Sequence, residues 1–412
     1  MLNETKVFQA EGITLEVVDS LYNQCPPSEI KVHACTKAQK IIIRNGTVYL
    51  TNLMPNNGLG YVELIGFLVE LYEASQVYRL PDVEFAYWHD DNAPGESERT
   101  ADGKWKWPFA PHGLPPLLAW SKAAVHGAVL VPYCGAFRCP RDSFDAIMGE
   151  VHNLSFTPFS QRSEVAFGRW NIFCAWYYRG ALKTADGQPA PCPRAHYDEL
   201  HHKYPQLLLT AAMGRNTSDG TLAHGVPLHS QHKHKYLVST DGWSISSKFD
   251  KYLLLGSAIL KAEGLTYGWY YPALRPYEHY LPIMSKHKDD ILEVLEWAKA
   301  HEAEAEAVGQ RAQTFAMRNL NRPMRLCYIF RLLTELSKYM KYTPDCSRRA
   351  QCVPLVEEIK FLAKHDHHAH KCRYQEVLAQ YGYDDPDGKP GFSGYEELKR
   401  KHEEIPAHAG FG

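Results

Sequence analysis

The chain has 412 residues, of which 45% are hydrophobic and 22% charged, and its formal net charge is −2. This length exceeds one ordinary hydrophobic core and predicts two domains with additional segments. The balanced charge leaves no basic footprint for nucleic acid, and no apolar run approaches the ~20 residues that span a bilayer. We therefore expect a globular protein with neither a nucleic-acid partner nor a transmembrane segment in this chain.

The signals for the cellular compartment disagree. The N-terminal residues MLNETKVFQAEGITLEVV lack the basic, apolar and small-residue pattern of a signal peptide, which alone favours the cytosol. Ten cysteines and four Asn-x-Ser/Thr sequons favour an oxidising, glycosylating lumen instead. The sequons are at Asn3, Asn45, Asn153 and Asn216. The final residues, HAGFG, contain no KDEL-type retrieval signal.

The first part of the chain predicts an α/β domain. Two β-prone runs around Asn45-Gly46 predict a hairpin over residues 41–50. A loop with the sequence PNNGLG then leads into an amphipathic helix predicted over residues 61–74. Cys134 and Cys139 bracket a later loop, and a disulfide between them is expected in an oxidising compartment.

Two adjacent aspartates, Asp90 and Asp91, follow a predicted buried strand at residues 83–88. Ligands of open α/β sheets bind at the carboxyl ends of the strands, so this position favours a functional carboxylate. Two alternatives stay open. The aspartates can form an Asx turn by bonding their own backbone, or they can be a carboxylate pair that binds a hard cation.

A second α/β unit is predicted to open near Arg162. The aromatic run at residues 170–178 predicts a strand that ends in Arg179 and Gly180. An arginine beside a glycine at the carboxyl end of a strand suits anion binding, although a surface arginine is the alternative. A further strand is predicted within residues 204–212.

The stretch from 232 to 283 carries the clearest pattern. A short apolar run at 236–238 predicts a strand, and the turn, a hydroxyl-rich segment and Lys248 follow it. Apolar spacing then predicts a helix over about 249–260. This order offers helix amides, hydroxyls and a cation to a diphosphate, or else forms an ordinary serine-rich N-cap. The candidate binding residues are Asp241, Gly242, Trp243, Ser244, Ser246, Ser247 and Lys248.

Helices are predicted after this stretch, at about 291–298, with an acidic continuation, and at about 322–340. Histidines gather at 229–234 and again at 365–370, but alternate strand residues point to opposite faces and no C-x-x-C pair is present. We expect no metal at either place. A charged terminal helix is predicted at 395–404.

The runs DGWSISSK, LLLGSAILK and ALRPYEHYLPI together resemble the signature of the capsule-associated glycosyltransferase family. That family includes the Rumi-like protein O-glucosyltransferases, the KDEL-motif-containing glucosyltransferases and fungal capsule xylosyltransferases. The matching positions are Asp241, Gly242, Ser246, Phe249, Ser257, Lys261 and Pro276 to Pro282. One position departs from the family pattern, because Lys248 stands where the family usually has arginine, and lysine lacks the bidentate fork.

The resemblance implies the glycosyltransferase B type of fold, with two Rossmann-like α/β domains facing a cleft. We expect an N-terminal extension at 1–40 and a first Rossmann-like domain, with the catalytic base, at 41–160. A second Rossmann-like domain at 161–288 would bind the donor. Helices at 289–344 would return to the first domain, and 345–412 would be a C-terminal extension.

The resemblance also implies an activity, namely transfer of glucose or xylose from UDP-glucose or UDP-xylose to a protein or glycan hydroxyl, with inversion. Asp91, or failing that Asp90, is the expected base. Arg179, Ser246, Lys248 and the amides after Gly242 are the expected diphosphate ligands, without a metal or another cofactor. Trp243 or Phe249 is expected to stack on uracil or to pack beneath the turn.

The family works in the secretory pathway, which implies the lumen of the endoplasmic reticulum or Golgi and a leader that precedes this sequence. Two other functions stay open. The lysine at position 248 and the uncertain base motivate an inactive relative that binds a nucleotide sugar or glycan without transferring it. A luminal interaction protein would use the fold only as a scaffold and bind no UDP.

Overall fold

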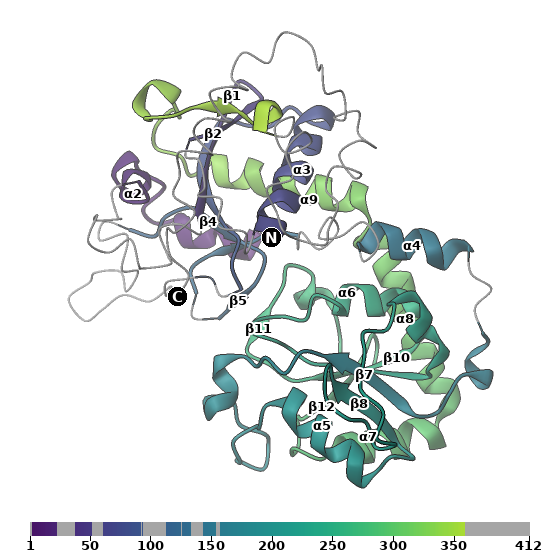
Figure 1. Ribbon diagram of the computed structural model, residues 1–412. Coiled ribbons are helices and arrows are strands. Elements are labelled where there is room, and N and C mark those ends of the chain that lie inside the picture. Colours follow the sequence, from purple (N-terminus) through teal and green to yellow (C-terminus); the bar gives the residue numbers. More distant parts are fainter. Residues whose placement is uncertain are drawn as a thin grey trace. The chain divides into compact units, whose positions relative to one another are not determined.

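The computed structural model describes residues 2–22, 38–51, 61–91, 93, 113–124, 126–132, 143–153 and 157–358. The predicted Cys134–Cys139 disulfide, the PNNGLG loop, the histidines at 365–370 and the terminal helix lie outside the described residues. The chain divides into two compact units (Figure 1). The first unit contains 1–140 and 325–412, and the second contains 141–324.

The first unit is built on a six-stranded mixed sheet in the order β13-β2-β1-β3-β4-β6. Its strands are β1 (Ala38–Arg44), β2 (Thr47–Leu50), β3 (Val83–Trp88), β4 (Leu117–Ala119), β6 (Val129–Leu130) and β13 (Val353–Pro354). The hairpin predicted around Asn45 is confirmed, since β1 and β2 pair antiparallel with Arg44 opposite Thr47. The predicted strand at 83–88 is also confirmed, and β3, β4 and β6 run parallel.

The remaining elements of the first unit are mostly helical. They are α1 (Leu2–Thr5), η1 (Lys6–Phe8), α2 (Leu15–Ser20), α3 (Tyr61–Val77), the short strand β5 (Lys122–Ala123), α9 (Arg322–Ser337) and η10 (Cys346–Arg348). The predicted helix at 61–74 is α3, and the helix expected at 322–340 is α9. A buried ion pair joins the two helices, with Arg325 Nε 2.6 Å from Glu70 Oε1.

Glu84, the second residue of β3, carries a buried carboxylate that several parts of the first unit contact. Tyr22 and Tyr342 donate hydroxyl hydrogen bonds to it at 2.7 and 2.8 Å, and Arg349 donates two more at 2.7 and 3.0 Å. Arg349 belongs to the segment that the Cys346–Cys352 disulfide closes. Every charge in this network has an opposite charge or donors, as buried ions require.

The second unit is built on a five-stranded sheet in the order β12-β10-β9-β7-β8, and all its paired strands run parallel. Its strands are β7 (Ala166–Trp170), β8 (Leu208–Ala212), β9 (Tyr236–Ser239), β10 (Ala258–Ala262) and β12 (Leu281–Ile283). The run predicted as a strand at 236–238 is confirmed as β9. Parallel strands place all their carboxyl ends at one edge of the sheet.

Helices cover both faces of this sheet, as expected for a parallel sheet that is buried on each side. They are α4 (Phe144–Asn153), α5 (Pro193–Lys203), α6 (Phe249–Tyr252), α7 (Ile291–Ala300) and α8 (Glu302–Asn319). The helix predicted at 291–298 is confirmed as α7, whereas its acidic continuation forms a separate helix, α8, after His301.

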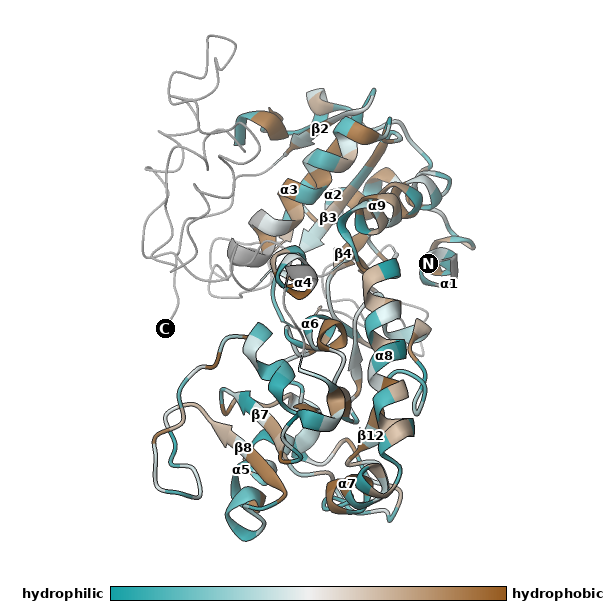
Figure 2. Cartoon of the chain, turned by 90° about the vertical axis from the view of Figure 1, so that its right-hand side faces the viewer, coloured by the Kyte–Doolittle hydropathy of each residue, from teal (hydrophilic) through white to brown (hydrophobic). Residues whose placement is uncertain are grey.

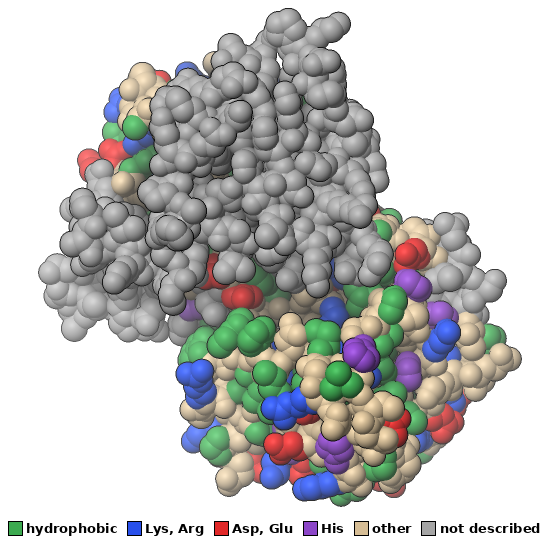
Figure 3. Space-filling view, in the orientation of Figure 1, with side chains coloured by type: hydrophobic (Ala, Val, Ile, Leu, Met, Phe, Trp, Pro, Cys, Tyr) green, Lys and Arg blue, Asp and Glu red, His purple; other side chains and the backbone are tan. Residues whose placement is uncertain are grey.

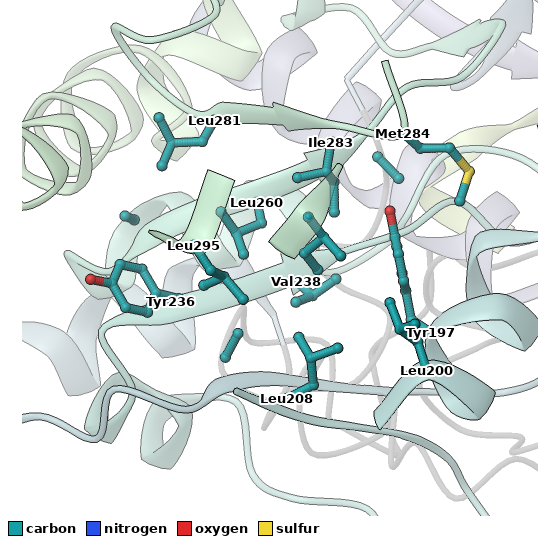
Figure 4. Packing of buried hydrophobic residues seen from close by; sticks show 14 of the residues in the cluster. Tyr197, Leu200, Leu208, Tyr236, Val238, Leu260, Leu281, Ile283, Met284 and Leu295 are labelled. Carbon is teal, nitrogen blue, oxygen red and sulfur yellow. The ribbon is translucent and has the colours of Figure 1, made fainter. Parts of the chain in front are cut away.

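On one face, α5 and α7 pack against alternate side chains of the strands. Figure 4 shows this cluster, with Leu208, Val238, Leu260 and Ile283 from four strands beside Tyr197, Leu200 and Leu295 from the helices. On the other face, α4 and α6 form a second cluster around Phe249. Figure 2 shows that α8 alternates hydrophilic and hydrophobic residues, and its small buried residues contribute to both clusters.

Short elements complete the second unit. They are the strand β11 (Thr266–Tyr267) and the 3₁₀ helices η5 (Phe159–Gln161), η6 (Trp176–Arg179), η7 (His229–Lys233), η8 (Leu253–Leu255) and η9 (Tyr271–Ala273). The structural boundaries differ from the expected limits at 160 and 288. The helix α4 contacts α6, and α7 contacts β12, so both belong to the second unit.

The strand predicted at 170–178 is wrong. The strand of this region is β7, which ends at Trp170, and the residues around Tyr177 form the 3₁₀ helix η6. The chain leaves the sheet because Cys174 is tied to Cys192, and Tyr177 turns inward to bond Asp241. The aromatic residues that raise the β-propensity of this run are used for tertiary packing instead.

The long helix predicted over 249–260 is also wrong. The helix α6 has four residues, η8 adds a tight turn, and Gly256 then adopts a left-handed conformation with φ 64°. The apolar run 258–262 that follows is the fully buried central strand β10. Short apolar runs of this kind fit a buried strand and a helix equally well by periodicity alone.

No helix in the described part of the chain combines the length and the apolar character needed to cross a membrane.

Candidate functional site

The turn after β9 lies at the carboxyl edge of the second sheet, and a buried carboxylate holds it in place. Asp241 is fully buried and accepts hydrogen bonds from Tyr177 Oη at 2.9 Å and from Lys261 Nζ at 3.1 Å. Gly264 passes so close that an added Cβ would clash with the Asp241 carboxylate. These contacts make Asp241 the anchor of the turn, so we interpret it as a structural residue instead of a direct ligand.

The predicted binding segment follows this anchor. Ser244 and Ser246 are buried, Ser247 is half-buried, and the amide of Lys248 approaches Ser246 Oγ at 3.4 Å. Gly242 faces the Arg194 guanidinium, because a Cβ built there would lie 3.0 Å from Nη2. The turn thus approaches this arginine closely, and a side chain at position 242 would have to displace the guanidinium slightly.

Three cations converge beside the turn. Arg194 donates to the carbonyl oxygens of Asn171 at 3.0 Å and Thr240 at 3.3 Å, and Lys248 donates to the carbonyl oxygen of Arg169. Burial, and then the positive charges of Arg194 and Arg169, lower the pKa of Lys248 to about 7. We call Arg169, Arg194 and Lys248 the cation cluster.

The Arg169 guanidinium lies over the Phe167 ring at 5.1 Å, but two of its donors have no partner among the described residues. The residue is 8% exposed, and its Nε and Nη1 are buried without a hydrogen-bond partner among the described residues. Burial also lowers the pKa of its guanidinium. Buried donors and charges are normally paired, so an orphaned arginine next to two other cations indicates a site for an anion.

Exposed apolar side chains surround the same edge of the sheet. Seven of them follow the carboxyl ends of β7, β8, β9 and β10, namely Ile172, Phe173, Trp176, Met213, Leu222, Trp243 and Leu265. Figure 3 shows hydrophobic side chains gathered on the visible face of this unit. Trp243 stacks on Phe173 with ring centroids 5.5 Å apart, and both rings are nearly half exposed. A stacked, exposed aromatic pair suits a planar ligand.

Arg179 and Gly180 are placed differently from the expectation. Arg179 is the last residue of η6 and is exposed, and Gly180 has a φ of 108° with open space around it. No hydrogen bond of the Arg179 side chain to another described residue is present. The cation at the end of the strand is Arg169 instead, and a binding role for Arg179 and Gly180 stays a prediction.

Several residues of the family-like signature have structural partners in the second unit. Ser257 Oγ donates to the carbonyl oxygen of His234 at 2.7 Å. Lys261 forms an ion pair with Asp241 at 3.1 Å. The segment from Pro276 to Pro282 leads into the amino end of β12, opposite the edge that carries the cation cluster. Arg311 of α8 holds this segment through the carbonyl oxygen of Glu278 at 2.9 Å.

Asp90 and Asp91 lie just beyond β3, at the carboxyl edge of the parallel strands of the first unit. Both are half-buried. Trp120, after the neighbouring strand β4, donates its indole N–H to the carbonyl oxygen of His89 at 3.3 Å and so fixes the start of this segment. The position fits a functional carboxylate, and the choice between Asp90 and Asp91 stays a prediction. Among the described residues, no group of three His, Cys, Asp or Glu is arranged to hold a metal ion.

Sequence reasoning missed Arg169 and Arg194. Arg169 is the penultimate residue of a strand that the sequence analysis placed too late, and Arg194 follows the proline that begins α5. Correct placement of β7 would have singled out Arg169. A charged residue at the carboxyl end of a buried strand is energetically unfavourable unless it has a partner or binds a ligand. Nothing local distinguishes Arg194 from an ordinary helix arginine.

Comparisons with known proteins agree with the sequence resemblance. The protein O-glucosyltransferase 3 of Homo sapiens is 34% identical over 128 residues, which is 31% of this chain and 25% of that protein. The protein O-glucosyltransferase 1 of Rattus norvegicus is 30% identical over 199 residues, which is 42% of this chain and 49% of that protein. The protein O-glucosyltransferase 2 of Danio rerio is 31% identical over 126 residues, which is 30% of this chain and 25% of that protein.

The matches thus span between a quarter and about half of the length of these curated relatives. The family model covers much more of the chain, because glycosyl transferase family 90 matches residues 30–375. That range includes both sheets, both aspartates and the cation cluster. The chain therefore belongs to glycosyl transferase family 90.

Proposed function

We propose that this chain transfers glucose or xylose from a UDP-sugar to a hydroxyl of a protein or glycan, with inversion at the anomeric carbon. In this proposal the two units are the domains of a glycosyltransferase B type fold. The second unit binds the donor, and the first supplies the base. Family membership and the names of the relatives, which are protein O-glucosyltransferases, support a glycosyltransferase that acts on protein.

The cation cluster is the main structural support for a donor site in the second unit. Breaking the bond between sugar and diphosphate leaves negative charge on the leaving oxygen, and preorganised donors stabilise that charge most where water is excluded. Arg169 and Arg194 offer guanidinium donors, and Lys248 adds a point charge whose proton is held loosely near neutral pH. A bound diphosphate would compensate all three positive charges, and the three cations would take the part that a metal ion has in other phosphate sites.

The residues around the cluster divide the remaining work of donor binding. Ser246 and Ser247 lie in the turn beside Lys248 and offer hydroxyls to phosphate or sugar oxygens. The exposed pair of Trp243 and Phe173 offers a flat apolar platform for the uracil ring. Phe249 is buried between Tyr271 and Tyr280, so of the two aromatic candidates we assign stacking to Trp243 and packing to Phe249.

Inversion requires one in-line attack on the anomeric carbon, so one base must take the proton of the acceptor hydroxyl on the face opposite UDP. We assign this role to Asp91, with Asp90 as its alternative. The other exposed apolar residues at the edge, such as Trp176 and Met213, suit contact with a protein acceptor, because aromatic residues and methionine are enriched in interfaces.

We also propose that the protein works in the secretory lumen, in the endoplasmic reticulum or Golgi. The disulfides Cys174–Cys192 and Cys346–Cys352 fit an oxidising compartment. The sequon residues Asn45 and Asn216 are exposed and fit N-glycosylation. Lys248 and the uncertain base motivated the alternative of an inactive relative, and the two arginines beside Lys248 favour the active enzyme instead.

The proposal is tested by transfer from UDP-glucose and from UDP-xylose to a protein acceptor library, with and without EDTA. We expect EDTA-insensitive transfer that favours one of the two sugars, and we expect that donor to raise the melting temperature most. Binding of UDP without transfer or donor hydrolysis would support the inactive relative. Absence of any thermal shift with UDP and both UDP-sugars would overturn the donor site.

A further inference from the structure

A disulfide sits directly beside the cation cluster. Cys174 lies in the segment that follows β7, and Cys192 is the N-cap residue of α5. The bond joins residues 18 apart in the sequence, with their Cα atoms 5.9 Å apart. It therefore ties the first turn of α5 to the loop at the carboxyl edge of the sheet.

On the α5 side, the bond holds Arg194, which is two residues after Cys192. Arg194 is 9% exposed, and its guanidinium bridges the carbonyl oxygens of Asn171 after β7 and Thr240 after β9. Its own carbonyl accepts the indole N–H of Trp170 at 3.0 Å. The position of this arginine thus depends on the exact docking of the start of α5 against the two loops.

On the loop side, the bond holds the residues that flank Cys174. Phe173 stacks on Trp243, and Tyr177 bonds the Asp241 carboxylate that anchors the turn. The segment between Asn171 and Phe173 is exposed and belongs to no strand, so it has few constraints apart from these contacts. One covalent bond therefore links the aromatic pair, the anchored turn and Arg194.

The Cys174–Cys192 bond opposes the electrostatic repulsion among the three cations. Arg169, Arg194 and Lys248 repel one another as long as no anion lies between them. Cys192 makes no side-chain cap hydrogen bond to α5, so a side-chain cap does not help to resist this repulsion at the helix start. The disulfide between the loop after β7 and the start of α5 keeps Arg194 close to Arg169 and Lys248. It thereby keeps the site preorganised before the ligand binds.

We infer that the Cys174–Cys192 disulfide is a positioning element of the donor site, which holds Arg194 against the diphosphate of the nucleotide. This inference rests on the proposed function, because it assumes that the cation cluster binds UDP. It predicts that loss of the bond weakens UDP binding through Arg194. A purely structural disulfide would change stability and leave the contribution of Arg194 to binding intact.

The test is a double-mutant cycle on UDP affinity, measured by calorimetry. The proteins compared are the wild type, C174S/C192S, R194Q and the triple variant that combines them. We expect the serine pair to weaken UDP binding by about tenfold, the worth of roughly one charge-assisted hydrogen bond. Arg194→Gln should cost about tenfold or more in the wild type, and less than about twofold once the disulfide is gone.

The matched control is C346S/C352S, which removes the disulfide of the first unit. It should keep UDP affinity within about twofold of the wild type even where it lowers stability. If C174S/C192S does not fold, graded reduction of folded wild type with dithiothreitol replaces it. The folded fraction is then followed by circular dichroism while UDP binding is measured.

The outcomes distinguish a positioning role of the disulfide from UDP binding by the cation cluster. If wild type does not bind UDP, the donor site is wrong and the inference falls with it. If wild type binds UDP but C174S/C192S or the reduced protein binds it equally well, only the inference is overturned. Additive effects of the serine pair and Arg194→Gln would likewise overturn it, because the disulfide would then act independently of Arg194.

Discussion

Each unit buries a charged cluster beneath or beside its sheet, and the two clusters differ in one respect. The cluster around Glu84 in the first unit is complete, since Arg349, Tyr22 and Tyr342 satisfy the carboxylate. The cation cluster in the second unit has three positive charges and, in Arg169, donors without partners among the described residues. A satisfied buried network indicates a structural role, whereas an uncompensated one indicates a missing ligand.

The largest effect on activity is expected from substitution of Asp91. This substitution removes the proposed base and leaves the charges of both clusters unchanged. Asp91→Asn should lower the turnover number by about 10²–10⁴-fold, the usual contribution of a general base. UDP affinity should stay close to that of wild type, because the proposed donor site belongs to the other unit. Asp90→Asn is the matched control, and a larger loss from Asp90→Asn than from Asp91→Asn would reassign the base to Asp90.

The next effect tests the satisfied cluster. Arg349→Met leaves the Glu84 carboxylate buried without its positive partner, and should lower the free energy of unfolding by about 3–5 kcal/mol. Denaturant unfolding followed by circular dichroism measures this change. UDP binding at a temperature where the variant is folded should be unaffected. A loss of less than about 1 kcal/mol would contradict a structural role for this network.

The same substitution in the other cluster should have the opposite sign. Arg169→Met removes a buried charge whose compensation among the described residues is the Phe167 ring at 5.1 Å and the attraction of Asp198, so the unliganded protein should be about as stable as wild type or more stable. UDP binding should weaken by about 10- to 100-fold, because charge-assisted hydrogen bonds to the diphosphate are lost. If Arg169→Met destabilises the protein and leaves UDP affinity unchanged, the arginine is structural after all.

The smallest expected effect is a change in the protonation of Lys248. Lys248 has a pKa of about 7 in the folded protein and an ordinary value of 10.5. Between these values the unfolded chain holds more protons, so the stability of the unliganded protein should rise with pH across this window. A bound diphosphate favours charged Lys248, so UDP binding at pH 8 should take up a fraction of a proton.

Calorimetry of UDP binding in buffers of different ionisation enthalpy measures this uptake. Lys248→Met should abolish both the uptake and its part of the pH dependence of stability. The same uptake in wild type and Lys248→Met would show that another group titrates.

Local pattern was sufficient where one signal dominated. The Asn45-Gly46 hairpin, the strand before Asp90 and the strand before Asp241 each combine an apolar run with a turn signal, and all three are present. These predictions succeeded because the local preference and the tertiary environment agree. They were enough to place the candidate base and the binding turn at the edges of parallel strands.

Tertiary contacts decided the rest. The run 258–262 is a central strand because neighbouring strands bury it, and the segment around Tyr177 leaves the sheet because a disulfide and Asp241 draw it away. Arg194 enters the site only through the packing of α5, and that packing involves Cys192. Residues that reach a site from a distant element carry no local signal in one sequence.

If the cation cluster binds the diphosphate of a nucleotide, the affinity measured by calorimetry in EDTA should differ between UDP and uridine, and pyrophosphate should compete with UDP. We predict that UDP binds at least ten times more tightly than uridine, about one charge-assisted hydrogen bond or more, and that pyrophosphate competes with it. Equal affinities for UDP and uridine, or no competition by pyrophosphate, would show that the cation cluster does not bind the diphosphate.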